Sequence, residues 1–163
     1  MTRDASLSAT PAPPEQVKGE MTRLLDEFVK DTAGVTHALL ASRDGMKQVV
    51  PSHMTTDSHI NWVDEMAAAF SGMAGLAKGV SGPNGDKLPV RQVLIERDDT
   101  LFLLVEAGVG AAFTTSGTSV ATVLVVLTRT DANMGTVAFA TGRLVQRFAP
   151  FMTTPVRARD GVA

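Results

Sequence analysis

A short chain reversal near the N-terminal end constrains the fold more than any other feature. Residues 35–50 form two strand-like apolar runs, and the tetrapeptide Ser42 to Gly45 separates them. An Asp-Gly pair between such runs predicts a tight β-hairpin, because glycine tolerates the positive φ that the reversal requires. Helix-like segments lie on both sides of this hairpin. The chain is therefore expected to begin with the order helix, strand, strand, helix.

The helix before the hairpin is predicted over residues 14–31. One face of it is apolar, since its hydrophobic residues recur at intervals of three or four: Val17, Met21, Leu24, Leu25 and Phe28. Pro14 suits the first turn of a helix, and Gly34 suits its end.

The helix after the hairpin is predicted over residues 57–78, with Asp57 or Ser58 as its cap. Its second half is rich in alanine, serine and glycine, although Gly72 and Gly75 each cost about 1 kcal/mol in a helix interior relative to alanine. Small side chains allow another backbone to approach closely. Two interpretations stay open: packing on the protein's own sheet, and contact with the same helix of a second copy.

Three further strand-like runs follow a glycine-rich loop at residues 81–85. They cover residues 88–96, 100–106 and 119–127, and the last is preceded by a second glycine-rich loop that starts at residue 107. The connection between the first two runs is tight, so they are expected to form a second hairpin.

A last helix is expected from about Asp131 to Phe148, where Pro150 would end it. The element order is then helix, strand, strand, helix, strand, strand, strand, helix. Hairpins make a sheet antiparallel, and helices must cover its faces. The predicted fold class is an α+β sandwich with a five-stranded antiparallel sheet.

One domain is expected over residues 15–150, because a chain of 163 residues is long enough for one hydrophobic core. Residues 1–14 are rich in Ser, Thr, Ala and Pro and are predicted to form a disordered tail. Residues 151–163 are predicted to form a flexible C-terminal tail.

Composition excludes several classes of function. A formal net charge of −2 gives no field that would attract nucleic acid or an acidic membrane, and one Trp with no Tyr offers few surfaces on which bases could stack. Cysteine is absent, which excludes thiolate catalysis and cysteine-based zinc sites and fits a cytoplasmic location. No secretory signal or membrane helix is visible, so any membrane association is expected to come through a partner.

No catalytic or cofactor-binding residue is predicted. The glycine-containing stretches 82–87 and 108–110 lack the residues of a phosphate-binding loop and the strand-to-helix context of a dinucleotide site, so turns are favoured for both. The stretch 114–119 is rich in hydroxyl groups, but no base is placed beside it.

No metal site is predicted either. His53 and His59 are close in the sequence and His37 lies in the first strand, but a metal ion would need further ligands in fixed geometry, such as Asp57. Histidines of surface loops are the favoured interpretation.

Charged residues occur in the run 88–96. Arg91 and Glu96 could protect an exposed sheet edge from promiscuous pairing, or they could set the register between two copies of this strand. The second interpretation is favoured.

These elements resemble the Roadblock family of dynein light chains and bacterial small-GTPase regulators. The resemblance covers residues 15–150 and rests on the order and spacing of five segments: Gly34-Val35, the hairpin 42–45, the alanine-rich helix through 65–69, the strand 91–96 and residues 132–135 at the last helix. Within the family, the chain is most similar to proteins of actinobacterial conserved operons that lie beside a sensor kinase and a Ras-like GTPase.

The resemblance implies two helices on one face of the sheet and one on the other. It also implies a homodimer, in which the middle helices meet and the third strands join into one continuous sheet. The residues then expected at the dimer interface are Ala67, Phe70, Ala74, Arg91, Val93 and Ile95.

Some members of the family bind a Ras-like GTPase and stimulate its GTP hydrolysis by repositioning the GTPase's own residues. The chain is accordingly interpreted as a non-enzymatic, cytoplasmic, homodimeric adaptor that regulates a Ras-like small GTPase, in a complex with a sensor histidine kinase. Asp64, Glu65 and Lys78 are the residues expected to bind the partner. Thr114 to Ser119 replaces the shorter, more apolar segment with which the family enters its last strand.

Two other classes of function stay open. A sandwich of this size could enclose a pocket and act as a small-ligand sensor domain, although the sequence shows no convergent polar groups. An enzyme with an unfamiliar site is least favoured, because no nucleophile, base or metal set is recognisable.

Overall fold

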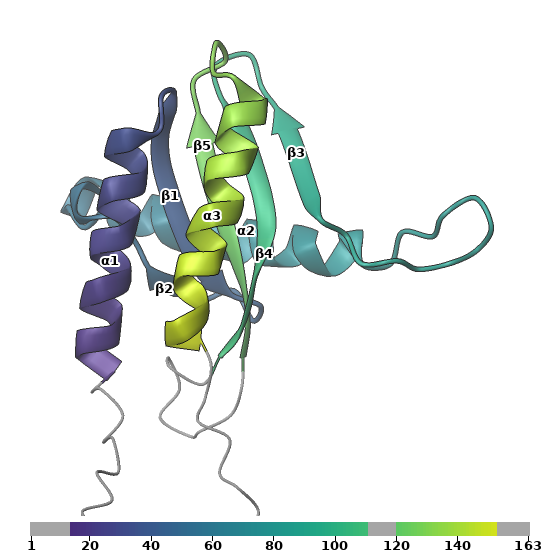
Figure 1. Ribbon diagram of the computed structural model, residues 1–163, viewed down its shortest axis with the longest axis horizontal. Coiled ribbons are helices and arrows are strands. Elements are labelled where there is room, and N and C mark those ends of the chain that lie inside the picture. Colours follow the sequence, from purple (N-terminus) through teal and green to yellow (C-terminus); the bar gives the residue numbers. More distant parts are fainter. Residues whose placement is uncertain (1–13, 111–119, 153–163) are drawn as a thin grey trace, which may run out of the picture.

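The computed structural model describes residues 14–110 and 120–152. Its elements follow the expected order, with one 3-10 turn added before the second helix (Figure 1). They are α1 (Pro14–Asp31), β1 (Val35–Ser42), β2 (Lys47–Val49), η1 (Ser52–Met54), α2 (Asp57–Ala77), β3 (Gln92–Glu96), β4 (Leu101–Gly110), β5 (Val120–Thr128) and α3 (Met134–Met152). The N-terminal tail up to residue 13, the stretch 114–119 and the C-terminal tail from residue 153 lie outside the described residues.

The five strands form one antiparallel sheet in the order β2-β1-β5-β4-β3. Strand β5 is in the centre, and β2 and β3 are the two edges. Both faces of the sheet are covered: α1 and α3 lie on one face and α2 lies on the other (Figure 1). The predicted α+β sandwich, with two helices on one face and one on the other, is confirmed.

The central strands are apolar on both faces because both faces are buried. In β1, Ala38 and Leu40 pack with α1 and α3, whereas Leu39 and Ala41 pack with α2. Strand β5 is buried in the same way at every position from residue 122 to 128. Such near-continuous hydrophobic runs are expected wherever a strand is covered on both sides.

The hairpin between β1 and β2 has the geometry that its sequence predicts. Gly45 has a φ of +92°, and its N–H donates to the carbonyl of Ser42 at 3.0 Å. The Ser42 hydroxyl donates to Asp44, so the side chains of the turn also help to hold it closed.

Helix α3 differs from the prediction at both ends. It begins at Met134 because Asn133 caps it, its side-chain oxygen accepting the N–H of Thr136 at 3.0 Å. The prediction that Pro150 ends the helix is wrong, since α3 continues to Met152, whose side chain is buried in the core under α1 and α3. A proline in the last turn interrupts few helical hydrogen bonds, and this burial holds the turn in place.

Helix α2 has a different cap from the two candidates. Its N-cap is Thr56, with φ −72° and ψ 154°, and not Asp57 or Ser58. The Thr56 hydroxyl lies 2.7 Å from Nδ1 of His59, so it bonds a side chain in the first turn.

The second hairpin also has shifted boundaries. Strand β3 begins only at Gln92, and residues 78–91 form an arm that reaches away from the body of the subunit (Figure 1). Strand β4 continues to Gly110, past the expected loop start at residue 107, through a register shift at Gly108 with φ +107°. The Thr122 hydroxyl of β5 donates to the Gly108 carbonyl at 2.9 Å and holds this irregular segment in the sheet.

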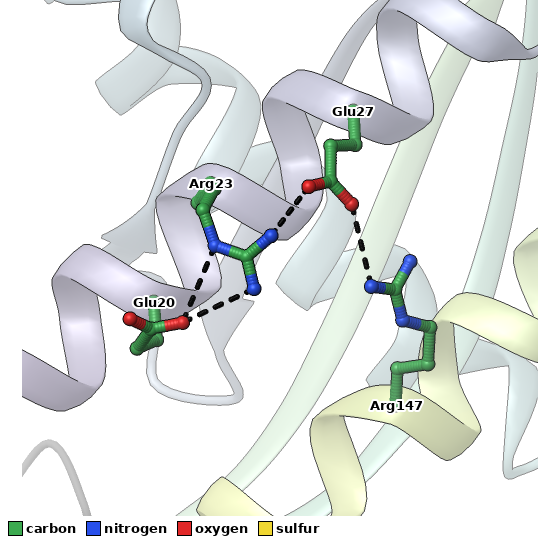
Figure 2. Close-up of polar contacts among 4 residues, drawn as sticks. All are labelled: Glu20, Arg23, Glu27 and Arg147. Carbon is green, nitrogen blue, oxygen red and sulfur yellow. Dashed lines mark hydrogen bonds and ion pairs between the residues drawn. The ribbon is translucent and has the colours of Figure 1, made fainter.

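Helices α1 and α3 are also joined at the surface by ion pairs (Figure 2). Arg23 of α1 pairs with Glu20 at 3.2 Å and with Glu27, and Glu27 pairs with Arg147 of α3 at 3.3 Å. The hydrogen bond to Glu20 and the charge of Glu27 raise the pKa of Arg23. All four side chains are largely exposed, so these pairs orient the helices more than they stabilise them.

Gly34, between α1 and β1, should be intolerant of any side chain. Its φ is +88°, and a Cβ there would lie 2.5 Å from the Cβ of Ala132. Gly34→Ala is expected to lower the free energy of unfolding by at least about 1–2 kcal/mol, from the left-handed backbone alone. Urea unfolding followed by circular dichroism would measure it.

Gly19→Ala is the matched control, because Gly19 lies inside α1 with no heavy atom within 4 Å of its added Cβ. It should raise the free energy of unfolding by about 1 kcal/mol. A Gly34→Ala variant as stable as the Gly19→Ala variant would contradict the role given to Gly34.

Candidate functional site

The candidate site is the surface formed by α2 and the edge strand β3, where the sequence places a dimer interface. Three of the residues expected there, Ala67, Phe70 and Ala74, are buried under α2 and pack on the protein's own sheet. Phe70, for example, stacks on Phe102 of β4 at 5.4 Å between ring centroids. In the single subunit these side chains pack between α2 and the sheet. Their contact with a second subunit stays a prediction.

The other three expected interface residues lie at the edge of the sheet. Arg91 directly precedes β3, and Val93 and Ile95 are half-buried on the side covered by α2. Leu94 projects from the opposite face and is 50% exposed. Within the described residues β3 pairs only with β4, so its outer edge is open to another strand.

The exposed face of α2 is lined by small residues from the half of the helix that the sequence offered for contact with a second copy, although they are not among the six expected interface residues. It carries Ala68, Ala69, Gly72 and Gly75, all exposed to solvent. Apart from the helix's own backbone, no described heavy atom lies within 4 Å of a Cβ added to either glycine. Glu65 lies on the same face at helical spacing, and this charge was the signal that could have separated the solvent side of the helix from the buried side.

The residues expected to bind a partner all lie on the surface of α2 and its C-terminal end. Asp64 forms an ion pair with Lys47 of β2 at 3.5 Å, and Lys78 forms one with Glu106 of β4 at 3.2 Å. Glu65 is exposed. Asp64 and Lys78 therefore also fasten α2 to the sheet, one near the middle of the helix and the other at its end.

Glu106 joins three segments at the C-terminal end of α2. Its carboxylate lies 3.2 Å from Lys78 at the end of α2 and 3.4 Å from Arg43 in the β1–β2 hairpin. A shallow pocket borders this junction, and Ala77 and Arg91 are among its lining residues. The end of α2, the hairpin and the start of β3 thus meet in one place.

A buried hydrogen bond attaches α2 to the same hairpin. The Ser71 hydroxyl donates to the carbonyl of Ser42 at 2.7 Å, and both residues are buried. The exposed ion pairs around Glu106 and this buried bond position the hairpin against α2.

The two glycine-containing stretches differ in structure. The loop at Gly82 closes on itself, since the N–H of Gly82 donates to the carbonyl of Asp86 at 2.7 Å and that of Gly85 to the carbonyl of Gly82 at 3.0 Å. Gly108 and Gly110 lie within β4 and do not lead into a helix. The prediction of a turn is confirmed for residues 82–87 and is wrong for residues 108–110, which pair with β5 at the end of β4. The hydroxyl-rich stretch 114–119 lies outside the described residues.

The three histidines lie closer together than the surface-loop interpretation suggests. The ring centroid of His37 is 5.4 Å from that of His53 and 6.1 Å from that of His59. Burial, then the charges of His53 and His59, lower the pKa of His37. Even so, residues 14–110 and 120–152 contain no group of three or more His, Asp or Glu side chains placed to hold a metal ion.

Two further observations bear on the nature of the site. In the described parts of the chain, every buried side-chain nitrogen or oxygen has a hydrogen-bond partner. Among the helices described, none combines the length and apolar character needed to cross a membrane.

Comparisons with known proteins identify relatives of the whole fold. The family model of the Roadblock/LC7 domain matches residues 21–116. The crystal structure of a Roadblock/LC7 domain from Streptomyces avermitilis is 30% identical, with a TM-score of 0.66, over 82% of this chain and 98% of that chain. None of the curated proteins matches the chain significantly.

More distant structures share the fold alone. The gliding protein MglB from Thermus thermophilus is 18% identical, with a TM-score of 0.62, over 85% of this chain and 90% of that chain. MglB from Myxococcus xanthus is 15% identical, with a TM-score of 0.55, over 80% of this chain and 93% of that chain.

The bond from Ser71 should contribute measurably to stability. Ser71→Ala is expected to lower the free energy of unfolding by about 0.5–1.5 kcal/mol, because one buried hydrogen bond is lost while the Ser42 carbonyl keeps the N–H of Gly45. Ser58→Ala, an exposed change on the same helix, should stay within about 0.5 kcal/mol of the unsubstituted protein. Equal urea midpoints for the two variants would show that the bond contributes nothing.

Proposed function

The chain belongs to the Roadblock/LC7 family, and from that membership we propose that it is a non-enzymatic, homodimeric adaptor that regulates a Ras-like small GTPase. The observation that carries the proposal is the meeting of an open sheet edge, β3, with the exposed small-residue face of α2. The two elements lie beside each other at one end, because the C-terminal end of α2 and the start of β3 line the same shallow pocket.

An edge strand with exposed backbone groups favours pairing with a second strand, and a second copy of β3 supplies one of equal length. The copies would run antiparallel about a two-fold axis. Residues directly opposite each other then project from the same face of the sheet, so the two residue numbers must both be odd or both be even. A register centred on Leu94 places Val93 beside the partner's Ile95 on the face that α2 covers.

The exposed face of α2 supports the same assembly. Pairing through β3 would bring the α2 helices of both copies to one face of a continuous sheet. Gly72 and Gly75 lack side chains where those helices would approach, and the absence of a side chain lets two backbones come close together. In solution the dimer would bury the faces that a single subunit leaves open.

The GTPase is proposed to bind across α2, with Asp64, Glu65 and Lys78 among the contacts. These side chains are exposed and combine both signs of charge, as the rim of a specific interface requires. The adaptor would supply no chemical group to the reaction and would act by repositioning residues of the GTPase. A sensor histidine kinase completes the proposed complex, which would lie in the cytoplasm and reach a membrane only through a partner.

The domain boundaries proposed from the sequence complete this description. A Roadblock domain over residues 15–150 would carry the interfaces. The proposed C-terminal tail of residues 151–163 loses its first two residues, because Phe151 and Met152 belong to α3 and Met152 is buried in the core. No observation in the described residues favours the alternative function of a small-ligand sensor, because the pocket beside α2 is shallow and exposed.

The register of the dimer can be tested by cross-linking, because the chain contains no cysteine. A Leu94→Cys variant should form a covalent dimer on mild oxidation, since opposite residues in an antiparallel pair lie within disulfide distance. Phe139→Cys is the control, because Phe139 is 68% exposed on the outside of α3, away from β3.

Sedimentation of the same proteins separates the two ways in which this experiment can fail. A dimer that cross-links no better through Cys at position 94 than at position 139 would disprove the register alone. A species of 17.2 kDa at micromolar concentration would disprove the homodimer and the proposed function with it.

The proposed regulation of a GTPase can be tested with the Ras-like GTPase that the resemblance leads us to expect beside the chain's gene. The adaptor is expected to bind it in a nucleotide-dependent way, and Glu65→Lys should weaken binding about tenfold or more, because the substitution reverses a charge within the contact surface. Glu15→Lys, the same change on exposed α1, should leave binding unaltered. Surface plasmon resonance with GDP-loaded and GTP-analogue-loaded GTPase measures both, and no binding in either state would count against the proposal.

A further inference from the structure

The other two histidines of the chain and its only tryptophan gather around His37, at the place where α2 begins. His37 comes from β1, His53 from η1, and His59 and Trp62 from the first turns of α2. The ring of His37 lies at the centre, with its centroid 5.4 Å from His53, 6.1 Å from His59 and 5.3 Å from Trp62. These contacts connect three separate elements through aromatic rings.

The surroundings of the cluster offer little to balance a positive charge. Leu127 of β5 lies opposite His37 in the sheet, and Trp62 packs against the apolar core under α2. The carboxylate of Asp26, which reaches η1 from α1, already accepts the N–H and the hydroxyl of Ser52, at 2.7 Å and 2.6 Å.

Asp57, two residues before His59 in the first turn of α2, is exposed. Among the described residues, none of the three histidines forms an ion pair. Protonation would therefore place like charges a few ångströms apart, with half-buried His37 between the other two. A positive charge on His59 would also lie at the N-terminal end of α2, where the helix dipole disfavours cations.

We propose that this cluster is a pH-sensitive latch, in which the neutral rings hold η1 and the first turns of α2 on β1, and protonation releases them. The inference rests on the packing of these three elements within one subunit, and it does not depend on the proposed function. The latch makes the packing of the first turns of α2 depend on pH, and the exposed face of this helix forms the candidate site.

The direction of the pH effect follows from His37. Burial, followed by the charges of His53 and His59, lowers its pKa in the folded protein below the ordinary value of 6.5. The unfolded chain then binds more protons than the folded chain as the pH falls below that value. The stabilisation from the latch is complete above pH 6.5 and is lost as the pH decreases through the folded pKa of His37.

Trp62 provides a local probe of the latch, because it is the only tryptophan and contacts both His37 and His59. A protonated imidazole quenches indole fluorescence more strongly than a neutral one. Protonation before release would lower the emission and release would move Trp62 away from the rings, so emission from the folded protein should change between pH 8 and pH 5, with a midpoint below 6.5. His37→Gln should remove most of this change, and His37→Phe provides a second variant that keeps an aromatic ring if the glutamine variant does not fold.

Release of the helix start can be measured by hydrogen exchange. After correction for the intrinsic rates, the hydrogen-bonded amides of Met54, Thr55 and His59 should lose protection several-fold between pH 7.5 and pH 5.5, while amides in the middle of α3 keep theirs. The double variant His53→Gln/His59→Gln should lose much less protection over the same range, since the repelling charges are gone. Unchanged protection in the unsubstituted protein, or an undiminished loss in the double variant, would overturn the latch.

Discussion

The burial of β1 and β5 on both faces is the constraint on which the rest of the structure depends. Two strands with apolar side chains on either side cannot remain exposed to water on either face, so helices must cover both. Helices α1 and α3 take one side and α2 takes the other (Figure 1). Because the apolar strands occupy the middle of the sheet, its two edges are the short strand β2 and strand β3. Exposed and half-buried residues alternate along β3, which is the open edge.

Much of this architecture could be predicted, because its signals are local. The Asp44-Gly45 turn, the apolar face of α1 and the element order require only neighbouring residues, and each was found in the structure. Where a distant contact decides, the prediction failed: Pro150 does not end α3, because Met152 is held in a core built from other elements. The face of α2 was ambiguous for the same reason, since small and apolar residues suit a sheet and a second helix equally well.

The candidate site shows the same division. The resemblance implied an interface at α2 and the edge strand, which stays a prediction, and Asp64, Glu65 and Lys78 are exposed. The ion pairs of Asp64 with Lys47 and of Lys78 with Glu106 could not be predicted, because the residues of each pair are distant in the sequence. The contact among three histidines from β1, η1 and α2 could not be predicted either, because the sequence does not show that the N-terminal end of α2 packs beside β1.

The attachment of α2 to the β1–β2 hairpin has two components with different sensitivity to the medium. The bond from Ser71 to Ser42 is buried, and ions in solution hardly weaken it. The ion pairs that Glu106 makes with Lys78 and Arg43 are partly exposed, so added electrolyte screens them. The hydrogen bond from Ser71 thus holds the hairpin on α2 at any ionic strength, whereas the strength of the attachment through Glu106 decreases as the ionic strength of the solution rises.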